Sequence, residues 1–271
     1  IHVEKGDICG IIGFSGAGKS TIISMIPRLY DVTAGSVNIA GTDVRKFDLD
    51  YLRKNIGIVT QDTYLFNGTV LDDVDAGIRS VNDMLAARGL PVIASVAQYR
   101  ELFGFPVIDY YRRLGLDVEK EDYYTILAPL WVSGYRTYAR DAGAVKGVRT
   151  LLDAIAKTGT EQVLLSASEC SLLREQLSAL GVEPYFQQVY GLDNIHAHSK
   201  ETLAQKWRDG HRDAIPLCIG DTLHDAEIAR AIHADCVLFA GGHQSLPRLA
   251  DAGFPVKDSM WDIGKTLGVY Q

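Results

Sequence analysis

The sequence predicts an α/β protein built around a parallel sheet. From about residue 145 to the end, short apolar runs alternate with stretches of helical periodicity, as in consecutive βαβ units. Near the start of the chain, an apolar run leads into a glycine-rich loop and then into a helical stretch. Between these two regions, residues 72–147 show helical periodicity. We therefore expect a parallel sheet with an all-helical insertion, preceded by a separate strand–loop–helix segment.

Length and composition describe a globular protein. The chain has 271 residues, enough for one large domain or two modest ones. Hydrophobic residues make up 47% and charged residues 23%, a balance that can bury a sizeable core. The net charge of -7 argues against nucleic acid as a partner, because nucleic-acid-binding proteins usually carry a basic patch.

The cysteines and the start of the chain indicate in which cellular compartment the protein is expected. Cys9, Cys170, Cys218 and Cys236 show no CxxC or metal spacing, and three of them lie in apolar runs typical of buried elements. We therefore expect reduced thiols in a cytoplasmic protein. No apolar run reaches the ~20 residues of a membrane span, and no signal peptide is recognisable. Because the chain begins at Ile1 and its first residues already resemble the middle of a domain, we expect it to derive from inside a larger ancestor.

The first predicted elements surround a glycine-rich loop. Residues 6–12 form a short apolar run between glycines, which predicts a buried strand. The next residues, GFSGAGKST, follow the G-x-x-x-x-G-K-[ST] pattern of a phosphate-binding loop. Lys19 adds a positive charge, the Ser20 hydroxyl can hold Mg²⁺, and residues 21–30 have the spacing of a helix that points its N-terminus at phosphates. The expected nucleotide-binding residues are Gly13, Ser15, Gly16, Gly18, Lys19, Ser20 and Thr21. The alternative is a glycine turn that arose by chance.

Residues 35–44 alternate in polarity like a half-exposed strand, and residues 52–61 contain a second apolar run. With the glycine-rich loop, these segments resemble the N-terminal part of an ATP-binding cassette (ABC) transporter nucleotide-binding domain of exporter type. The resemblance implies that Gln61 is the Q-loop glutamine, which contacts Mg²⁺ and a transmembrane partner. It covers about residues 1–70, because the family's signature sequence, Walker B carboxylates and switch histidine do not follow. It therefore implies ATP as a candidate ligand and argues against transport and efficient ATP hydrolysis.

The insertion and the sheet come next along the chain. We expect helices at residues 71–89, 93–103, 107–114 and 123–141. Six tyrosines of this region are expected to form its core and line a cleft: Tyr110, Tyr111, Tyr123, Tyr124, Tyr135 and Tyr138. Strands are expected at residues 162–166, 185–189, 215–221 and 235–239, separated by helices at residues 145–158, 171–180, 199–209 and 225–233. Residues 63–66 are expected to supply the central strand.

Polar side chains stand at the ends of these strands. Ser166 ends one strand, and Asp221 and Asp225 follow another in a strand-to-helix turn, where two carboxylates suit Mg²⁺. Lys200 opens a helix and can balance phosphate charge. The alternatives are a helix cap for the two aspartates and an exposed helix-start position for Lys200. The histidines His196, His198, His224, His233 and His243 show no zinc spacing and are expected at the surface or in packing.

With the sequence Asn67-Gly68-Thr69, these residues resemble the haloacid-dehalogenase-like (HAD) hydrolase superfamily, closest to phosphoglycolate-phosphatase-like members with a helical cap. In that family the first Asp of Asp-x-(Asp or Asn)-Gly-Thr attacks phosphorus, and Mg²⁺ bridges it to the later carboxylates. The resemblance implies catalytic positions at Asn67, Thr69, Ser166 and Lys200 and metal ligands at Asp221 and Asp225. It also places Leu65 where the nucleophile belongs, and leucine can neither attack nor bind a metal. Asp62, Asp72 and Asp73 lie nearby, but none falls on the strand-end position.

These resemblances divide the chain. We expect an ABC-type fragment at residues 1–62, a HAD-like core at residues 63–71 and 148–271, and a helical cap at residues 72–147. The expected function is a Mg²⁺-dependent phosphate monoester hydrolase scaffold for a small phosphorylated substrate, impaired at Leu65. The alternatives are an ATP-binding module of an ABC transporter ATPase and a fusion without activity. Because both family patterns are cut within residues 65–70, we expect a chimera.

Overall fold

The computed structural model describes residues 1–12, 18–28, 31–56, 62–67, 70–192 and 200–270. The chain forms two compact units, Ile1–Thr60 and Gln61–Gln271, each with its own elements. None of the helices in the described ranges is long and apolar enough to cross a membrane.

The first unit contains short elements. They are helix α1 (Lys19–Met25), strands β1 (Asn38–Ile39) and β2 (Thr42–Asp43), the 3₁₀-helix η1 (Val44–Lys46) and helix α2 (Leu49–Lys54). The two strands pair antiparallel, and both turn residues between them, Ala40 and Gly41, have positive φ angles of 49° and 78°. Such a two-residue turn matches the twist of a hairpin. The expected half-exposed strand at residues 35–44 is therefore a hairpin, and the helix expected at residues 21–30 begins and ends earlier.

The prediction of a buried strand at residues 6–12 is wrong. This segment has no strand, and Ile8 and Ile12 are almost fully exposed, with Cys9 between them exposed as well. An apolar run becomes a strand when another strand pairs with it and a hydrophobic face covers it. The described part of this unit offers little such cover, since Val44 and Leu52 are its buried aliphatic side chains.

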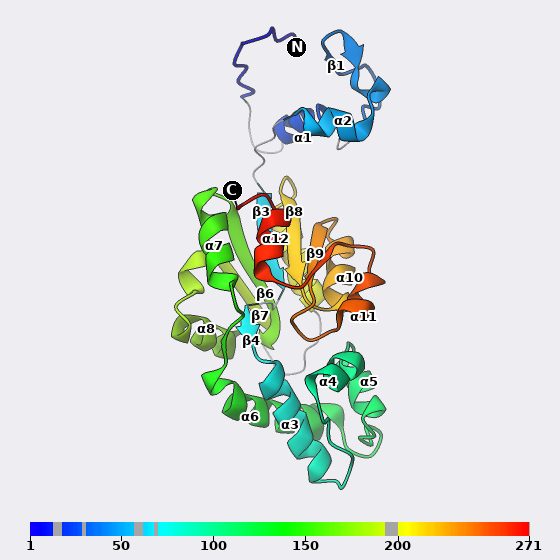
Figure 1. The fold of residues 1–271 in the computed structure, drawn as a ribbon, viewed down its shortest axis with the longest axis vertical. Coiled ribbons are helices and arrows are strands. Elements are labelled where there is room, and N and C mark those ends of the chain that lie inside the picture. Colours follow the sequence, from blue (N-terminus) through cyan, green and yellow to red (C-terminus); the bar gives the residue numbers. More distant parts are fainter. Residues whose placement is uncertain (13–17, 29–30, 57–61, 68–69, 193–199, 271) are drawn as a thin grey trace. The chain divides into compact units, whose positions relative to one another are not determined.

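A six-stranded parallel sheet forms the centre of the second unit, in the order β10-β9-β8-β3-β6-β7 (Figure 1). The strands are β3 (Asp62–Asn67), β6 (Glu161–Glu169), β7 (Gln188–Leu192), β8 (Ile215–Gly220), β9 (Asp235–Phe239) and β10 (Val256–Lys257). β3 lies between β8 and β6, so the expected central strand is confirmed. The strand expected at residues 185–189 begins later. Residues 183–185 form a 3₁₀-helix, η4 (Glu183–Tyr185), in which Pro184 lacks the N–H that a strand needs.

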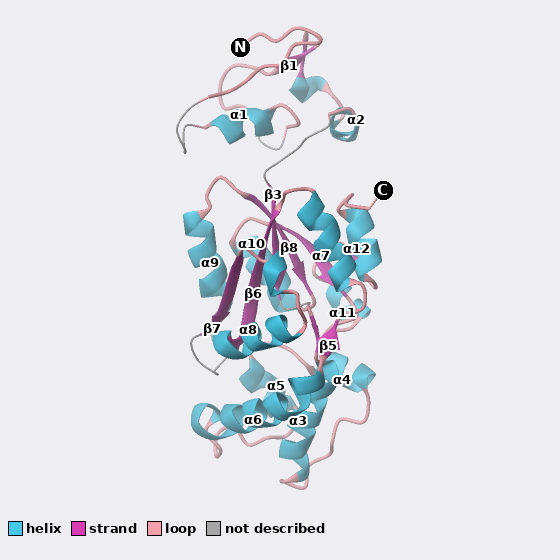
Figure 2. Ribbon diagram, turned by 90° about the vertical axis from the view of Figure 1, so that its left-hand side faces the viewer, coloured by secondary structure: helices cyan, strands magenta, loops and turns pink. Residues whose placement is uncertain are grey.

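Helices cover both faces of this sheet (Figure 2). Helices α7 (Val148–Lys157), α8 (Cys170–Ala179) and α12 (Met260–Thr266) pack on one face, and α9 (Lys200–Gly210), α10 (Leu223–Ala231) and α11 (Leu246–Ala250) pack on the other. Side chains of β3 alternate between these faces, as the two-residue period of a strand requires. Phe66 belongs to the first apolar cluster and Leu65 to the second, and both are completely buried.

The expected all-helical insertion is confirmed as a cap at the carboxyl ends of the sheet strands (Figure 1). It lies between two short strands that pair antiparallel, β4 (Leu71–Asp72) and β5 (Gly143–Ala144). Its helices are α3 (Val74–Ala86), α4 (Val96–Leu102), α5 (Val107–Arg113), the π-helix η2 (Tyr123–Leu127), α6 (Ala128–Tyr138) and the 3₁₀-helix η3 (Ala139–Asp141). Val81, Leu85 and Leu127 form the cap core together with the buried rings of Tyr110 and Tyr111.

Candidate functional site

The candidate site lies where β3 and β8 end side by side, next to the last part of β6. Asn67, the last residue of β3, is opposite Leu165 of β6 and Gly220 of β8. Asp221 directly follows the end of β8, whereas Ser166 follows Leu165 within β6, which runs on to Glu169 and not only to residue 166 as expected. The carboxyl ends of neighbouring parallel strands form the usual ligand-binding edge of such a sheet.

The turn between β8 and α10 is held together by the Asp225 carboxylate. Its Oδ2 atom accepts hydrogen bonds from the backbone N–H groups of Asp221 (2.9 Å) and Thr222 (3.0 Å) and from the Thr222 hydroxyl (2.8 Å). Thr222 and Asp225 together form a capping box at the start of α10. A Cβ atom on Gly220 would lie 2.3 Å from Asp225 Cβ, so the turn needs glycine there.

Lys200 is buried, and the exposed position considered for it is wrong. It is the first residue of α9, and its Nζ lies 2.6 Å from Asp225 Oδ1. Both side chains are almost fully covered, with side-chain exposures of 8% and 1%. Breaking such a buried pair leaves an uncompensated charge, which costs about 3–5 kcal/mol. The pair therefore places a cation firmly beside Asp221 and Ser166.

The two carboxylate oxygens of Asp221 differ, because one accepts a hydrogen bond from a described residue and the other is open, meaning that it accepts none. Its Oδ2 accepts the backbone N–H of His243 at 2.7 Å, and its Oδ1 has no hydrogen bond to a described residue. Burial raises the pKa of Asp221 to about 6, opposed by the charge of His243 and reinforced by the neighbouring Asp225. The carboxyl therefore gains a proton in mildly acidic solution.

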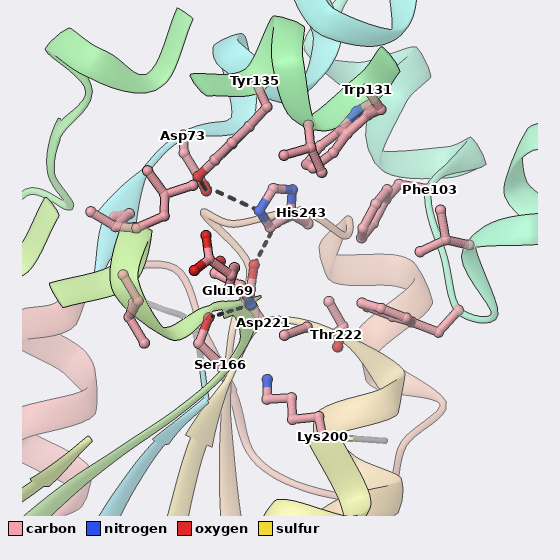
Figure 3. Close-up of a pocket in the computed structure, with 18 of the residues that line it drawn as sticks. Asp73, Phe103, Trp131, Tyr135, Ser166, Glu169, Lys200, Asp221, Thr222 and His243 are labelled. Atoms are coloured by element: carbon pink, nitrogen blue, oxygen red, sulfur yellow. Dashed lines mark hydrogen bonds and ion pairs between the residues drawn. The ribbon is translucent and has the colours of Figure 1, made fainter. Parts of the chain in front are cut away.

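A partly buried ion pair between Asp73 and His243 completes the polar edge (Figure 3). His243 Nε2 lies 3.2 Å from Asp73 Oδ1, the Tyr135 hydroxyl donates to Asp73 Oδ2 at 2.5 Å, and the Tyr99 hydroxyl lies 2.9 Å from His243 Nδ1. Burial alone lowers the pKa of His243, but the charge and hydrogen bond of Asp73, with Asp221, raise it to about 9. The pKa of Asp73 is lowered, because its hydrogen bonds and the charge of His243 outweigh its burial.

Sequence reasoning missed this pair. The sequence predicts His243 at the surface or in packing, and its ring does pack against Tyr99 and Phe103, but the prediction does not include the ion pair with Asp73. The contact joins segments far apart in the chain, which periodicity cannot reveal. The available signal was the glycine pair before His243, since a Cβ on Gly242 would lie 2.0 Å from Asp221 Oδ2. The loop can therefore approach that carboxylate because it has no side chain there.

Leu65, expected at the position of a nucleophile, lies inside the sheet. It pairs with Val163 and Cys218, is completely buried, and is not among the residues that line the cavity of the site. The strand-end position opposite Gly220 belongs to Asn67, two residues later. The strand end therefore carries an amide side chain by sequence, and Leu65 fills the core.

The remaining expected residues fall into two groups. Gly18 (φ 81°), Lys19 and Thr21 lie at α1 of the first unit, together with the backbone of Ser20. The others lie outside the described residues: Gly13, Ser15, Gly16, Gln61 and Thr69.

A cavity of about 170 Å³ opens between the cap and these strand ends. Figure 3 shows its two sides: the rings of Phe103, Trp131 and Tyr135 come from the cap, whereas Ser166 comes from β6 and Lys200 from the start of α9. Ser166 is buried, and its Oγ accepts the backbone N–H of Ser168 at 3.1 Å. The cavity thus has polar side chains on the side of the sheet, which we call its floor, and aromatic rings on the side of the cap, which we call its roof.

The described residues do not by themselves make a magnesium site. No group of three or more His, Cys, Asp or Glu side chains within the described ranges is arranged to hold a metal. Both oxygens of Asp225 already accept hydrogen bonds, and Asp73 is held by His243 and Tyr135. Of these three described aspartates, Asp221 offers an open oxygen, whereas Mg²⁺ prefers six oxygen ligands.

The N-terminal part of the chain is similar to ABC transporters. The family model described as "ABC transporter" matches residues 1–123. Over 83 residues the chain is 44% identical to the ATP-dependent lipid A-core flippase of Syntrophus aciditrophicus, covering 31% of this chain and 14% of the flippase. Over 89 residues it is 42% identical to the multidrug resistance protein pgp-1 of Caenorhabditis elegans, covering 32% of this chain and 7% of that protein. The chain therefore spans a small part of the curated relatives it matches.

The larger unit is similar to HAD phosphatases. Its fold matches a predicted phosphatase from Clostridium acetobutylicum with a TM-score of 0.62 and 18% identity, over 77% of this chain and 99% of that one. It also matches a haloacid dehalogenase-like family hydrolase from Streptococcus pneumoniae with a TM-score of 0.60 and 16% identity, over 78% and 98% of the two chains. The family model described as "Haloacid dehalogenase-like hydrolase" covers residues 64–239, overlapping the ABC match from residue 64 to residue 123. Because that model covers more than half of the 271 residues, the chain belongs to the haloacid dehalogenase-like hydrolase family, with a segment similar to ABC transporters before it.

Proposed function

We propose that residues 63–71 and 148–271 form the core of a phosphate monoester hydrolase scaffold, that residues 72–147 form its cap, and that its turnover is impaired. The observation that carries this proposal is the buried Lys200–Asp225 pair, which lines the same cavity as Ser166. A buried ammonium and a hydroxyl at one cavity edge suit an anion such as a phosphoryl group. Family membership supports the same class of substrate, a small phosphorylated molecule.

The charges of the site favour anion binding at mildly acidic pH. Above pH 6 four carboxylates line the cavity, those of Asp73, Glu169, Asp221 and Asp225, and the cations beside them are Lys200, His243 and Arg136, which pairs with Glu169 at 2.6 Å. A dianion then gains no net attraction from the described side chains. When Asp221 takes up a proton, these three cations face three carboxylates, and an incoming anion no longer meets excess negative charge.

We expect impaired turnover because the residues at the end of β3 include no carboxylate that could attack phosphorus. A HAD hydrolase attacks phosphorus with a strand-end carboxylate, whereas this chain has Leu65 buried in the sheet and Asn67 at the strand end. Neither an alkyl group nor an amide is an effective nucleophile. Loss of a covalent nucleophile removes several orders of magnitude in rate. We therefore expect phosphate ester binding without efficient hydrolysis, and the described residues give no reason to invoke Mg²⁺ in a step.

Hydrolysis of 4-nitrophenyl phosphate tests this proposal, with and without magnesium chloride. We expect background rates for the unaltered chain and a gain of at least about tenfold for Asn67→Asp, which introduces a carboxylate at the strand end two residues after the family's nucleophile position. Leu65→Asp should unfold the protein instead, because it buries a carboxylate in an apolar core. Asn55→Asp, an exposed change in the first unit, is the matched control. Fast turnover by the unaltered chain would overturn the missing-nucleophile proposal.

A second candidate function is ATP binding by the first unit without efficient hydrolysis. It is supported by the glycine-rich sequence ending in Lys19 and by the similarity to an ATP-dependent flippase. By analogy with such relatives, we expect Gln61 of this chain to contact Mg²⁺ and a transmembrane partner. Calorimetric titration with ATP and Mg²⁺ tests it, and we expect Lys19→Ala to abolish the binding heat. Identical heats from both proteins would remove this function.

We also propose that the chain is a chimera of two families. The two family models overlap between residues 64 and 123, a region that contains β3 and the start of the cap. The sequence of β3 therefore serves a HAD-like sheet while it resembles an ABC transporter. An origin of β3 in an ABC-type sequence explains why this central strand of a HAD-like sheet lacks the aspartate of the HAD family.

A further inference from the structure

We propose that the cavity selects phosphoryl or phosphonyl anions that carry one apolar group the size of an aromatic ring. This inference rests on the proposed phosphate site and adds the class of group attached to the phosphorus. It concerns the roof of the cavity, which the proposed chemistry leaves unused.

The size of the cavity fits one ring. Its volume is about 170 Å³. A cavity of about 150 Å³ inside another protein, lined by apolar side chains, binds benzene. The space above Ser166 and Lys200 therefore holds one ring or a branched alkyl group and is too small for a nucleoside.

The chemistry of the roof also favours an apolar group. Phe103, Phe105 and Val107 line it from the α4–α5 region of the cap, and Trp131 and Tyr135 line it from α6, where their rings stack at 4.8 Å. A polyhydroxylated group such as a sugar or glycerol would bring several hydroxyls against these carbon surfaces and leave them unpaired. A ring would instead pack against the aromatic faces.

Tyr110 adds one polar contact to this roof. It lines the cavity, its exposure is 1%, and its hydroxyl has no hydrogen-bond partner within the described part of the chain. Burial raises the pKa of this hydroxyl well above its usual value, so it remains a neutral donor. A ring that carries a hydrogen-bond acceptor would satisfy it.

Calorimetric titration at pH 5.5 with inorganic phosphate, methylphosphonate and phenylphosphonate tests the proposal. We expect phenylphosphonate to bind at least about tenfold more tightly than methylphosphonate, because only the former buries a ring. If phosphate and both phosphonates bind equally, the inference is overturned while the phosphate site stands. If none of the three binds, the proposed phosphate site fails and the inference fails with it.

Two substitutions in helix α6 test where in the cavity the ring of phenylphosphonate binds. Val132→Phe adds bulk to a cavity-lining residue of α6, and Leu130→Phe adds the same bulk to an exposed residue of that helix that does not line the cavity. We expect Val132→Phe to lower phenylphosphonate affinity about tenfold with phosphate affinity unchanged, and Leu130→Phe to alter neither. A ring preference that survives Val132→Phe would place the ring elsewhere and overturn the inference. Circular dichroism confirms that each variant is folded.

Tyr110→Phe tests the polar contact separately. We expect it to weaken binding of 4-methoxyphenylphosphonate several-fold and to leave phenylphosphonate unchanged, because only the former carries an acceptor on the ring. Equal binding of 4-methoxyphenylphosphonate by both proteins would remove Tyr110 from the proposal and leave the ring-sized pocket in place.

Discussion

The carboxylate of Asp73 sets the charge of His243. A buried imidazole without partners would be neutral, because burial disfavours its charged form. The ion pair with Asp73, supported by Asp221, reverses this and raises the pKa of His243 to about 9. At neutral pH both ring nitrogens therefore carry protons, and His243 donates to Asp73 and to the Tyr99 hydroxyl. One side chain thus joins the loop after β9 to α4 of the cap.

Replacing Asp73 by asparagine should lower the pKa of His243 from about 9. The amide keeps the shape of the carboxylate and removes its charge, so that burial regains its influence on the imidazole. A pH titration followed by the nuclear magnetic resonance signal of the His243 ring measures the change. Asp72→Asn, at an exposed neighbouring position, should leave this pKa as it is. An equal pKa in all three proteins would show that Asp73 does not control it.

The same pKa predicts how stability depends on pH. His243 titrates near 6.5 when unfolded and near 9 when folded, so its stabilisation is complete below pH 6.5 and is lost as pH rises to 9. A shift of this size corresponds to about 3 kcal/mol. Urea unfolding at pH 6.5 and pH 9 measures it, and His243→Gln provides the reference. We expect the stability difference between the two proteins to shrink over this interval; a constant difference would refute the linkage.

At the scale of elements, the β8–α10 turn depends on close packing around Gly220. Alanine there would bring a Cβ atom to 2.3 Å from Asp225 Cβ, so the capping box must shift. We expect Gly220→Ala to destabilise the protein by about 1–3 kcal/mol, as overpacking does. Gly210→Ala, at the end of α9, meets no atom within 4 Å and should have little effect. Urea midpoints compare the two variants, and equal midpoints would contradict the packing argument.

Elements buried on both faces were predictable from sequence, whereas long-range contacts were not. β8 and β9 are continuous apolar runs followed by helices, and their local pattern was sufficient to find them. The run at residues 6–12 has a similar composition but remains exposed, because a strand also requires neighbours that its own sequence does not specify. Ser166, near the end of β6, and Asp221, directly after β8, were found for the same local reason. The Asp73–His243 pair was missed because β-sheet topology creates it.

At the scale of the whole molecule, the two units bury very different amounts of apolar surface. The second unit has one apolar cluster on each face of its sheet and another inside the cap. In the described part of the first unit, Val44 and Leu52 are buried, while Ile1, Ile8, Ile12 and Tyr51 are exposed. Burial of apolar surface must offset the conformational entropy lost on folding, at about 1–2 kcal/mol per residue for the backbone. The second unit meets this requirement far better than the first.

This contrast predicts separate stabilities within one chain. In hydrogen exchange of the 271-residue chain, we expect the amides of β1, β2 and α2 to exchange within seconds to minutes, because local opening exposes little apolar surface there. Amides of β3, β6 and β8 should stay protected for hours, since their exchange requires the sheet to unfold. β3 is the informative element, because its sequence resembles an ABC transporter while its hydrogen bonds belong to the HAD-like sheet. Protection of β3 equal to that of β6 would establish that the sheet determines its stability, whereas exchange as fast as that of β1 would detach it from the core and contradict the fold.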